Sequence, residues 1–239
     1  GGDATPAQEP AKTPEAKPAA EAPAEPAGEP GNITVTVAFE GAAPERAKLD
    51  RTADPFCAKT EALTEDVIVN GNSTLRNVVV RLKKVKGKFD APADAIKLSQ
   101  NGCAYAPHVQ AAMKGQAIEI VNGDATLHNV HSYKGEKKKN WFNVAQPPGA
   151  PAKVDKLKKA ELATFKCDVH PWMSAYVLTT EHPFVGVTGD EGTVALNGVP
   201  SKGKAYEVIA WHETFGEQTA EALVEAGKTA EVKITFKAN

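Results

Sequence analysis

The sequence predicts an all-β protein made of two sandwich-like units, for three reasons. Short runs rich in valine, isoleucine and threonine recur along most of the chain, and glycine, proline and asparagine separate them. No long stretch has the apolar spacing of an amphipathic helix. A boundary is predicted near Glu181-His182-Pro183, where one series of β-type runs ends and a second begins.

The first unit is predicted to span residues 32–181 and the second residues 182–239. In the first unit, the β-type runs are Ile33–Val37, Val67–Val69, Val78–Leu82, Ala117–Val121, Leu127–Val130, Ala160–Phe165 and Ser174–Leu178. In the second unit they are Phe184–Thr188, Gly192–Leu196, Ala205–His212 and Ala230–Phe236. A β unit as small as the second is marginally stable alone, so we expect it to pack against the first.

Residues 1–31 are predicted to form a disordered tail. The first 30 residues hold seven of the 17 prolines, nine alanines and six acidic residues, but no Val, Ile, Leu, Met or aromatic residue. Such a segment has no apolar side chains to bury. Two interpretations stay open: a plain flexible leader, or a tether whose lipid-bearing cysteine precedes Gly1. We expect membrane attachment only through such an anchor, because no apolar run approaches the length of a membrane span.

Charge and cysteine content limit the function classes. A net charge of −2 gives no electrostatic case for nucleic-acid binding. Three cysteines are an odd number, which in an exported protein indicates one pair and one residue kept for other work. Cys57 and Cys103 lack the spacing of metal ligands, so we expect them to form a disulfide. A disulfide would fit a periplasmic or other extracytoplasmic location.

The remaining cysteine lies in a short motif of metal-binding residue types. Phe165-Lys166-Cys167-Asp168-Val169-His170-Pro171-Trp172-Met173 has C-x2-H-x2-M spacing on a tight loop between two predicted strands. His128 begins an upstream strand. Two histidines and a cysteine in a trigonal set, with a weak axial methionine, are the ligands of blue-copper sites, so the sequence predicts one mononuclear copper site. The alternatives are a buried structural cysteine, a structural histidine and a core methionine.

These motifs resemble those of the cupredoxin (type 1 copper) family, with a ligand-loop spacing similar to that of the amicyanins. The resemblance covers residues 32 to about 180 and implies a Greek-key sandwich with copper at one end. It implies that Asn129 orients the loop and turns its backbone amide toward the cysteine sulfur. Pro171 and Trp172 are expected to exclude water. The resemblance also implies that His170 lies nearest the surface and forms the exit for electrons.

The predicted function is to carry single electrons between redox partners, such as a cytochrome or an oxidoreductase, in the cell envelope. The alternative is copper binding and delivery without electron transfer, although carriers often use methionine-rich sets and this chain has only two methionines. We expect no catalysis. Cys167 is flanked by Lys166 and Asp168 rather than by a histidine that could bridge to a second copper. A binuclear site would also need a cysteine at position 163, which is alanine.

Four other histidines lie outside this set. His131 is three residues from His128 in one predicted strand, so the two rings are expected to point to opposite faces. His108, His182 and His212 are interpreted as structural or interface residues without an assigned role. The stretch Tyr206–Glu213 resembles the carboxypeptidase-regulatory, transthyretin-like β fold. Lysines between Lys134 and Lys139 are interpreted as a solvated loop or as a docking patch for an acidic partner.

Overall fold

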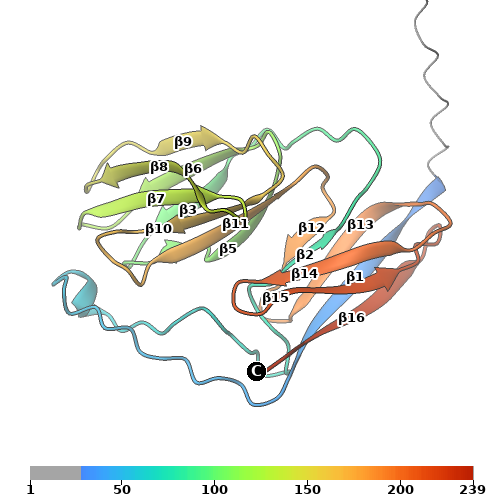
Figure 1. Cartoon of the computed structure of the whole chain (residues 1–239), viewed down its shortest axis with the longest axis horizontal. Coiled ribbons are helices and arrows are strands. Elements are labelled where there is room, and N and C mark those ends of the chain that lie inside the picture. Colours follow the sequence, from blue (N-terminus) through green and yellow to red (C-terminus); the bar gives the residue numbers. More distant parts are fainter. Residues whose placement is uncertain (1–27, 239) are drawn as a thin grey trace, which may run out of the picture.

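The protein is described here by a computed structural model over residues 28–238, which form two β-sandwiches lying side by side (Figure 1). Sixteen strands and one short 3-10 helix, η1 (Cys57–Lys59), are the regular elements of this range. The predicted all-β class is therefore confirmed. Within residues 28–238, no helix is long and apolar enough to cross a membrane. Residues 1–27 of the predicted tail lie outside the described residues. Residues 28–31, which the prediction also assigned to the tail, belong to a strand.

The first sandwich pairs a four-stranded sheet with a five-stranded sheet. The four-stranded sheet has the order β4 (Tyr105–Ala106), β3 (Ile96–Gln100), β6 (Ala117–Asn122) and β9 (Lys153–Lys156). The five-stranded sheet has the order β5 (Val109–Met113), β11 (Ser174–Thr180), β10 (Leu162–Lys166), β7 (His128–Lys134) and β8 (Lys139–Gln146). Alternate residues of β6 and β7 are buried, as expected for strands with one face on a core. That core includes Leu98, Ile118, Ile120, Val130, Phe165 and Val177.

The second sandwich also consists of two sheets. One has the order β13 (Thr193–Ser201), β1 (Gly28–Glu40) and β16 (Thr229–Lys237). The other has the order β12 (Val185–Val187), β2 (Val79–Leu82), β14 (Tyr206–His212) and β15 (Gly216–Ala222). Their inner faces share a core that includes Ile33, Val35, Val80, Leu82, Leu196, Val208 and Ile234.

The boundaries predicted for the two units need correction. β1 runs parallel to β16 over nine paired residues and antiparallel to β13, and β2 pairs with β12 and β14. Two strands expected in the 32–181 unit therefore complete the sheets of the second sandwich. The first sandwich, β3 to β11, is in effect inserted into the second. The physical reason is that alternation of apolar residues shows which face of a strand is buried, but not which sheet the strand joins.

The chain between β1 and β2 leaves the second sandwich and extends to the first. We call residues 46–66 the strap. Its two arms are joined by the Lys48–Leu63 bridge and by a hydrogen bond from Arg46 Nε to the Thr64 carbonyl of 2.6 Å. Figure 1 shows the strap passing below the first sandwich with η1 at its far end. Cys57, in η1, belongs to the core of the first sandwich, so the strap packs onto that unit although its ends leave the second one.

A separate apolar cluster joins the two sandwiches. It contains Val79 of β2, Val109 of β5 and Leu178 of β11, with Tyr176 and Trp211 packed at its edge. The outer face of the five-stranded sheet is thus covered along β5 and β11. The expectation that the second unit packs against the first is confirmed.

A buried ion pair lies at the same interface. His108, just before β5, pairs through Nε2 with the Glu213 carboxylate, which follows β14, and its Nδ1 lies 3.0 Å from the Ser174 carbonyl oxygen. Burial lowers the pKa of His108, but the hydrogen bond and charge of Glu213 outweigh it and raise the pKa above its ordinary value. The role of His108 is therefore to link the two sandwiches.

Candidate metal centre

Three of the four predicted ligands meet at one end of the first sandwich. His128 is the first residue of β7, and Cys167 and His170 lie on the loop that joins β10 to β11. Because β10 pairs with β7, the start of β7 and the end of β10 lie at the same edge. Ligand atoms of the three residues all lie within 4.8 Å of one another. The strand pairing and the loop therefore bring the ligand atoms of these three residues together, as the sequence predicts.

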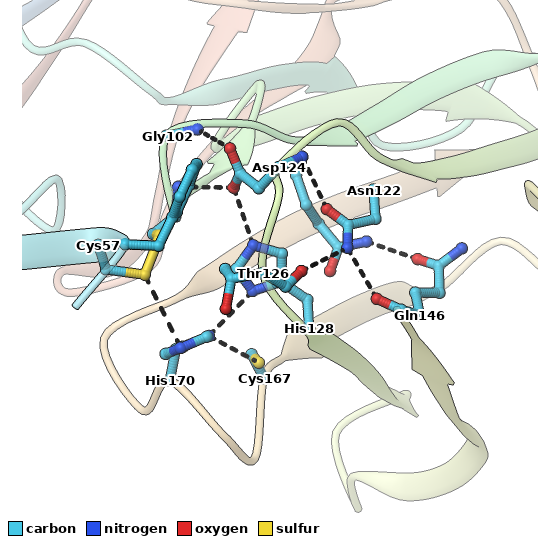
Figure 2. Close-up of polar contacts among 12 residues, drawn as sticks. Cys57, Gly102, Asn122, Asp124, Thr126, His128, Gln146, Cys167 and His170 are labelled. Atoms are coloured by element: carbon cyan, nitrogen blue, oxygen red, sulfur yellow. Dashed lines mark hydrogen bonds and ion pairs between the residues drawn. A yellow bond between two sulfur atoms is a disulfide. The ribbon is translucent and has the colours of Figure 1, made fainter. Parts of the chain in front are cut away.

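The donor atoms face one another inside the protein (Figure 2). His128 Nδ1 lies 2.9 Å from His170 Nδ1, and Cys167 Sγ lies 3.7 Å from His170 Nδ1. His128 is 0% exposed, Cys167 is 2% exposed and His170 is 1% exposed. Cys167 is the free cysteine among residues 28–238. Two imidazole nitrogens and one thiol, all buried and close to one another, fit a copper ion of the blue type, which prefers a trigonal His2Cys set.

The cysteine sulfur also accepts a hydrogen bond from the start of β7. The Asn129 backbone amide donates to Cys167 Sγ over 3.4 Å, the contact that the family resemblance implies. Asn129 Oδ1 in turn accepts from the Asp168 backbone amide at 2.5 Å. The Tyr105 hydroxyl donates to the Asn129 carbonyl at 2.8 Å and lies 3.2 Å from the Lys166 carbonyl. Asn129 thus orients the loop that carries Cys167 and His170, and Tyr105 links β7 to β10.

Each histidine is held from behind by a carboxylate. His128 Nε2 lies 2.8 Å from Asp124 Oδ2, and His170 Nε2 lies 3.0 Å from Asp54 Oδ2. A carboxylate partner on one ring nitrogen fixes the tautomer and leaves the other nitrogen free to bind a metal. Here both rings present Nδ1 to the centre. The two carboxylates therefore fix the ring orientation in which both Nδ1 atoms face the centre.

Both carboxylates are themselves immobilised. Asp124 accepts from the backbone amides of Gly102 and Cys103 at 2.7 and 2.8 Å (Figure 2). Asp54 accepts from Thr126 Oγ1 at 2.8 Å and from two strap amides. Burial raises the pKa of Asp54, but these hydrogen bonds, with the one to His170, outweigh it and hold the pKa well below its ordinary value. Burial of His128 lowers its pKa despite the bond to Asp124.

Sequence reasoning missed Asp54 and Asp124. Asp54 is 116 residues from the histidine it contacts, and no spacing rule connects them. Asp124 lies four residues before His128, but in the turn before β7, where a carboxylate is also typical of a solvent-exposed turn. The nearest signal was the stretch Asn122-Gly123-Asp124, which could have indicated a tight turn.

The predicted disulfide is present beside the centre. Cys57 and Cys103 are bonded, with their Cα atoms 5.6 Å apart. The bond joins η1 in the strap to the turn between β3 and β4. Cys57 Sγ lies 3.8 Å from His170 Nε2 (Figure 2). The disulfide therefore does more than link two loops, because it holds the strap against a ligand.

The expectation that His170 lies nearest the surface is wrong. His170 is 1% exposed, because Asp54 and Cys57 cover its Nε2 edge and the Trp172 ring lies 5.0 Å from its own ring. Trp172 is fixed by a hydrogen bond from its indole nitrogen to the Cys103 carbonyl of 3.0 Å. The strap, which the resemblance did not include, accounts for the difference.

The fourth predicted ligand, Met173, is buried next to this set. It is 1% exposed, and its backbone closes the loop: its amide donates to the His170 carbonyl at 2.9 Å, and its carbonyl accepts from the Cys167 amide at 3.4 Å. Its role as an axial ligand stays a prediction. Trp172 covers the centre as expected, whereas Pro171 is exposed and contributes little to excluding water.

The other histidines lie apart from the three ligands. His131 points outward from β7, opposite to His128, as predicted, and its Nδ1 lies 3.0 Å from the Asp168 carboxylate. His182 Nε2 lies 3.1 Å from the Leu82 carbonyl. His212 stacks on Phe215 with ring centroids 5.0 Å apart. His182 and His212 are thus buried structural residues of the second sandwich.

No family model matches this chain, and no curated protein matches it either. Several solved structures of copper proteins do. Amicyanin from Paracoccus versutus is 21% identical over 42% of this chain and 97% of its own, with a TM-score of 0.32. A purple cupredoxin from Nitrosopumilus maritimus is 18% identical over 36% of this chain and 100% of its own, with a TM-score of 0.32. A copper-containing nitrite reductase from Thermus scotoductus is 16% identical over 42% of this chain and 25% of its own, with a TM-score of 0.34. These values are too low to assign a function, which is therefore inferred from the site of this chain.

Proposed function

We propose that this chain binds one type 1 copper ion through His128, Cys167 and His170, with Met173 as the axial ligand, and carries single electrons. The observation that supports this proposal is the convergence of two Nδ1 atoms and one sulfur in a buried pocket whose histidines are both locked by carboxylates. A bound copper ion would supply one-electron cycling between Cu(I) and Cu(II). The chain supplies the fixed donor positions that such cycling needs.

Rigidity of the donors favours electron transfer over other uses of copper. The ligands are placed by the paired strands β7, β10 and β11, by the disulfide, and by hydrogen bonds to both histidines. A site that keeps one geometry in both oxidation states has little to reorganise when an electron moves, and hydrogen bonds around the sulfur tune the potential.

Copper delivery is less well supported than electron transfer. A carrier must exchange its metal with a partner, which requires that ligands become accessible. All three donors are buried here, and the strap is fastened over one of them by a covalent bond. We likewise propose no enzymatic reaction, because the residues beside Cys167 are Lys166 and Asp168 and provide no histidine bridge to a second copper.

The proposed location is extracytoplasmic. The disulfide between Cys57 and Cys103 supports this, because such bonds persist in oxidising compartments and are rare in the cytosol. On the basis of the sequence, we also propose a lipid tether before residue 1 and a cytochrome or oxidoreductase as redox partner.

The test is to add Cu(II) to the metal-free protein and record visible and paramagnetic resonance spectra. We expect an intense thiolate-to-copper band, one copper per chain, and reversible one-electron reduction. Cys167→Ser removes the thiolate and should abolish the band. His131→Ala is the matched control, because it removes a histidine of the same strand that points away from the site, and it should keep the band. A wild-type protein without the band contradicts the copper site, and a band that cannot be cycled favours delivery.

A further inference from the structure

The second sandwich reaches the strand that follows the ligand loop. Glu213 comes directly after β14, and its carboxylate pairs with Nε2 of His108, which precedes β5. The other ring nitrogen of His108, Nδ1, lies 3.0 Å from the carbonyl oxygen of Ser174. Ser174 is the first residue of β11 and follows Met173, the proposed axial ligand. A chain of two contacts therefore leads from the second sandwich to the residue next to that ligand.

His108 holds the start of β11 at two points. Besides the contact of its ring with Ser174, its backbone carbonyl accepts a hydrogen bond from the Tyr176 amide over 2.9 Å. The His108 ring also lies edge-on to the Tyr176 ring, with the centroids 5.6 Å apart. Because Met173 is bonded to Ser174, the placement of the His108 ring affects the placement of Met173.

The pair of His108 and Glu213 is shielded from water. The His108 side chain is 6% exposed and the Glu213 side chain is 10% exposed. Removing one partner of a buried pair leaves the other without a hydrogen bond, which costs more free energy than the loss of an exposed pair. The position of the His108 ring is therefore set by Glu213.

Close packing does not fix the ligand loop on this side. A hollow of about 410 Å³ lies between the strap and the first sandwich, and it is bordered by His108, Trp172, Met173, Ser174 and Glu213. Atoms that face such a hollow have no packed neighbours on that side. Hydrogen bonds therefore matter more than packing for the position of this end of the loop.

A small movement of the loop would matter for a blue-copper site. An axial methionine binds copper weakly and over a long distance, and the axial ligand tunes the reduction potential. Such a weak bond cannot pull the loop into place by itself. The protein must position the sulfur, and the contacts behind Met173 are the means to do so.

We propose that Glu213 is a positioning residue of the copper site: through His108 and Ser174, it fixes the place of Met173 and so tunes the reduction potential. The proposal rests on the copper site and the axial role proposed above. It gives the second sandwich a part in electron transfer, in which it shapes the site without supplying a ligand.

Two conservative variants of Glu213 separate the reach of its side chain from its charge. Glu213→Gln keeps the length and removes the charge, and its amide can still donate to His108 Nε2 while Nδ1 donates to Ser174. Glu213→Asp keeps the charge but is shorter by one methylene, which weakens the contact with the ring. Glu217→Gln is the matched control, because the Glu217 side chain is 48% exposed and pairs with Arg81 within the same sandwich.

The readouts in the copper-loaded protein are the reduction potential and the paramagnetic resonance spectrum. Groups that contact a ligand directly change metal affinity about 10- to 100-fold, so through two intermediates we expect Glu213→Asp to shift the Cu(II)/Cu(I) equilibrium roughly three-fold or more. The potential should rise, because Cu(II) loses part of its axial donor. Glu213→Gln and Glu217→Gln should match the wild type. A shift in Glu213→Gln as large as in Glu213→Asp would indicate charge alone and overturn the proposal, as would unchanged values throughout.

A second measurement needs no copper. In the metal-free Cys167→Ser protein, which has no free thiol, hydrogen peroxide transfers one oxygen atom to a methionine sulfur and becomes water. Peptide mapping gives the rate for each of the two methionines. Met113 is the internal control, because it is 5% exposed and lies at the end of β5 farther from His108. Relative to Met113, we expect Met173 to oxidise faster when Glu213→Asp is added, because the loop opens more often.

The two measurements separate the possible failures. Equal oxidation of Met173 with and without Glu213→Asp would show that Glu213 does not hold the loop, while the copper site would stand. A wild-type protein without the thiolate-to-copper band would remove the copper site and its tuning together, whatever the oxidation rates.

Discussion

Breaking the Cys57–Cys103 bond should both destabilise the protein and open the proposed copper site. The bond closes a loop of 46 residues. In the chain-entropy account, a cross-link of that span lowers the conformational entropy of the unfolded chain by about 13 cal/mol/K. This corresponds to a stabilisation of the folded state by about 4 kcal/mol at ~25 °C. Both cysteines are buried in the first sandwich, so the folded state can hold the bond in place. Reduction should therefore lower the free energy of unfolding by a few kcal/mol.

The assay is urea unfolding of the metal-free protein with and without reductant, followed by tryptophan fluorescence. The Cys57→Ala, Cys103→Ala double variant serves as control, because reductant should leave its unfolding curve unchanged. A reduced wild type within about 1 kcal/mol of the oxidised protein would refute the reasoning, since it would show that the loop is restrained without the bond.

The same perturbation has a second readout in the copper-loaded protein. With the strap no longer fastened, the cover on His170 should open more often, and copper should pass to a chelator faster than from the oxidised protein. An unchanged rate would mean that the strap stays closed by its hydrogen bonds, such as those of Asp54, and that the disulfide contributes stability alone.

Two further predictions concern carboxylates. Asp54→Asn replaces the charged partner of His170 with a neutral one, so we expect the reduction potential to rise and Cu(II) affinity to fall about 10- to 100-fold. Asp50→Asn, an exposed change on the same strap, should shift neither in potentiometric and metal-competition titrations. At the sandwich interface, Glu213 raises the pKa of His108. A raised histidine pKa adds stability that is complete below its ordinary value and is lost as pH rises through the folded value. The stability gap between wild type and Glu213→Gln, from urea unfolding between pH about 5.5 and about 9, should therefore shrink with rising pH, and a gap that widens would contradict the assigned pair.

Much of the metal centre follows from short-range sequence. Cys167 and His170 lie on one tight loop between two strands, so their separation is limited by the loop itself. The period of a strand puts His128 and His131 on opposite faces, and the structure has His128 inside and His131 outside. The disulfide was predictable because two of the three cysteines lacked metal-type spacing.

The long-range features were decided by tertiary structure. β1 and β2 carry the alternation of buried strands, but that pattern does not reveal that they pair with β16 and β14 instead of with their neighbours in the chain. Strand pairing depends on surfaces that many residues create together after the chain has closed large loops. The domain boundary drawn from sequence was therefore wrong at the N-terminal side.

The surroundings of the ligands were likewise decided by the tertiary structure. Asp54 reaches His170 across 116 residues, because a strap that leaves the second sandwich is bonded to the first. The sequence by itself determined which residue types could bind copper and that a loop could gather them. Only the tertiary structure decided that His170 is covered while Asp168, Val169 and Pro171 of the same loop are exposed, because burial depends on what packs over a residue and not on the residue's own spacing.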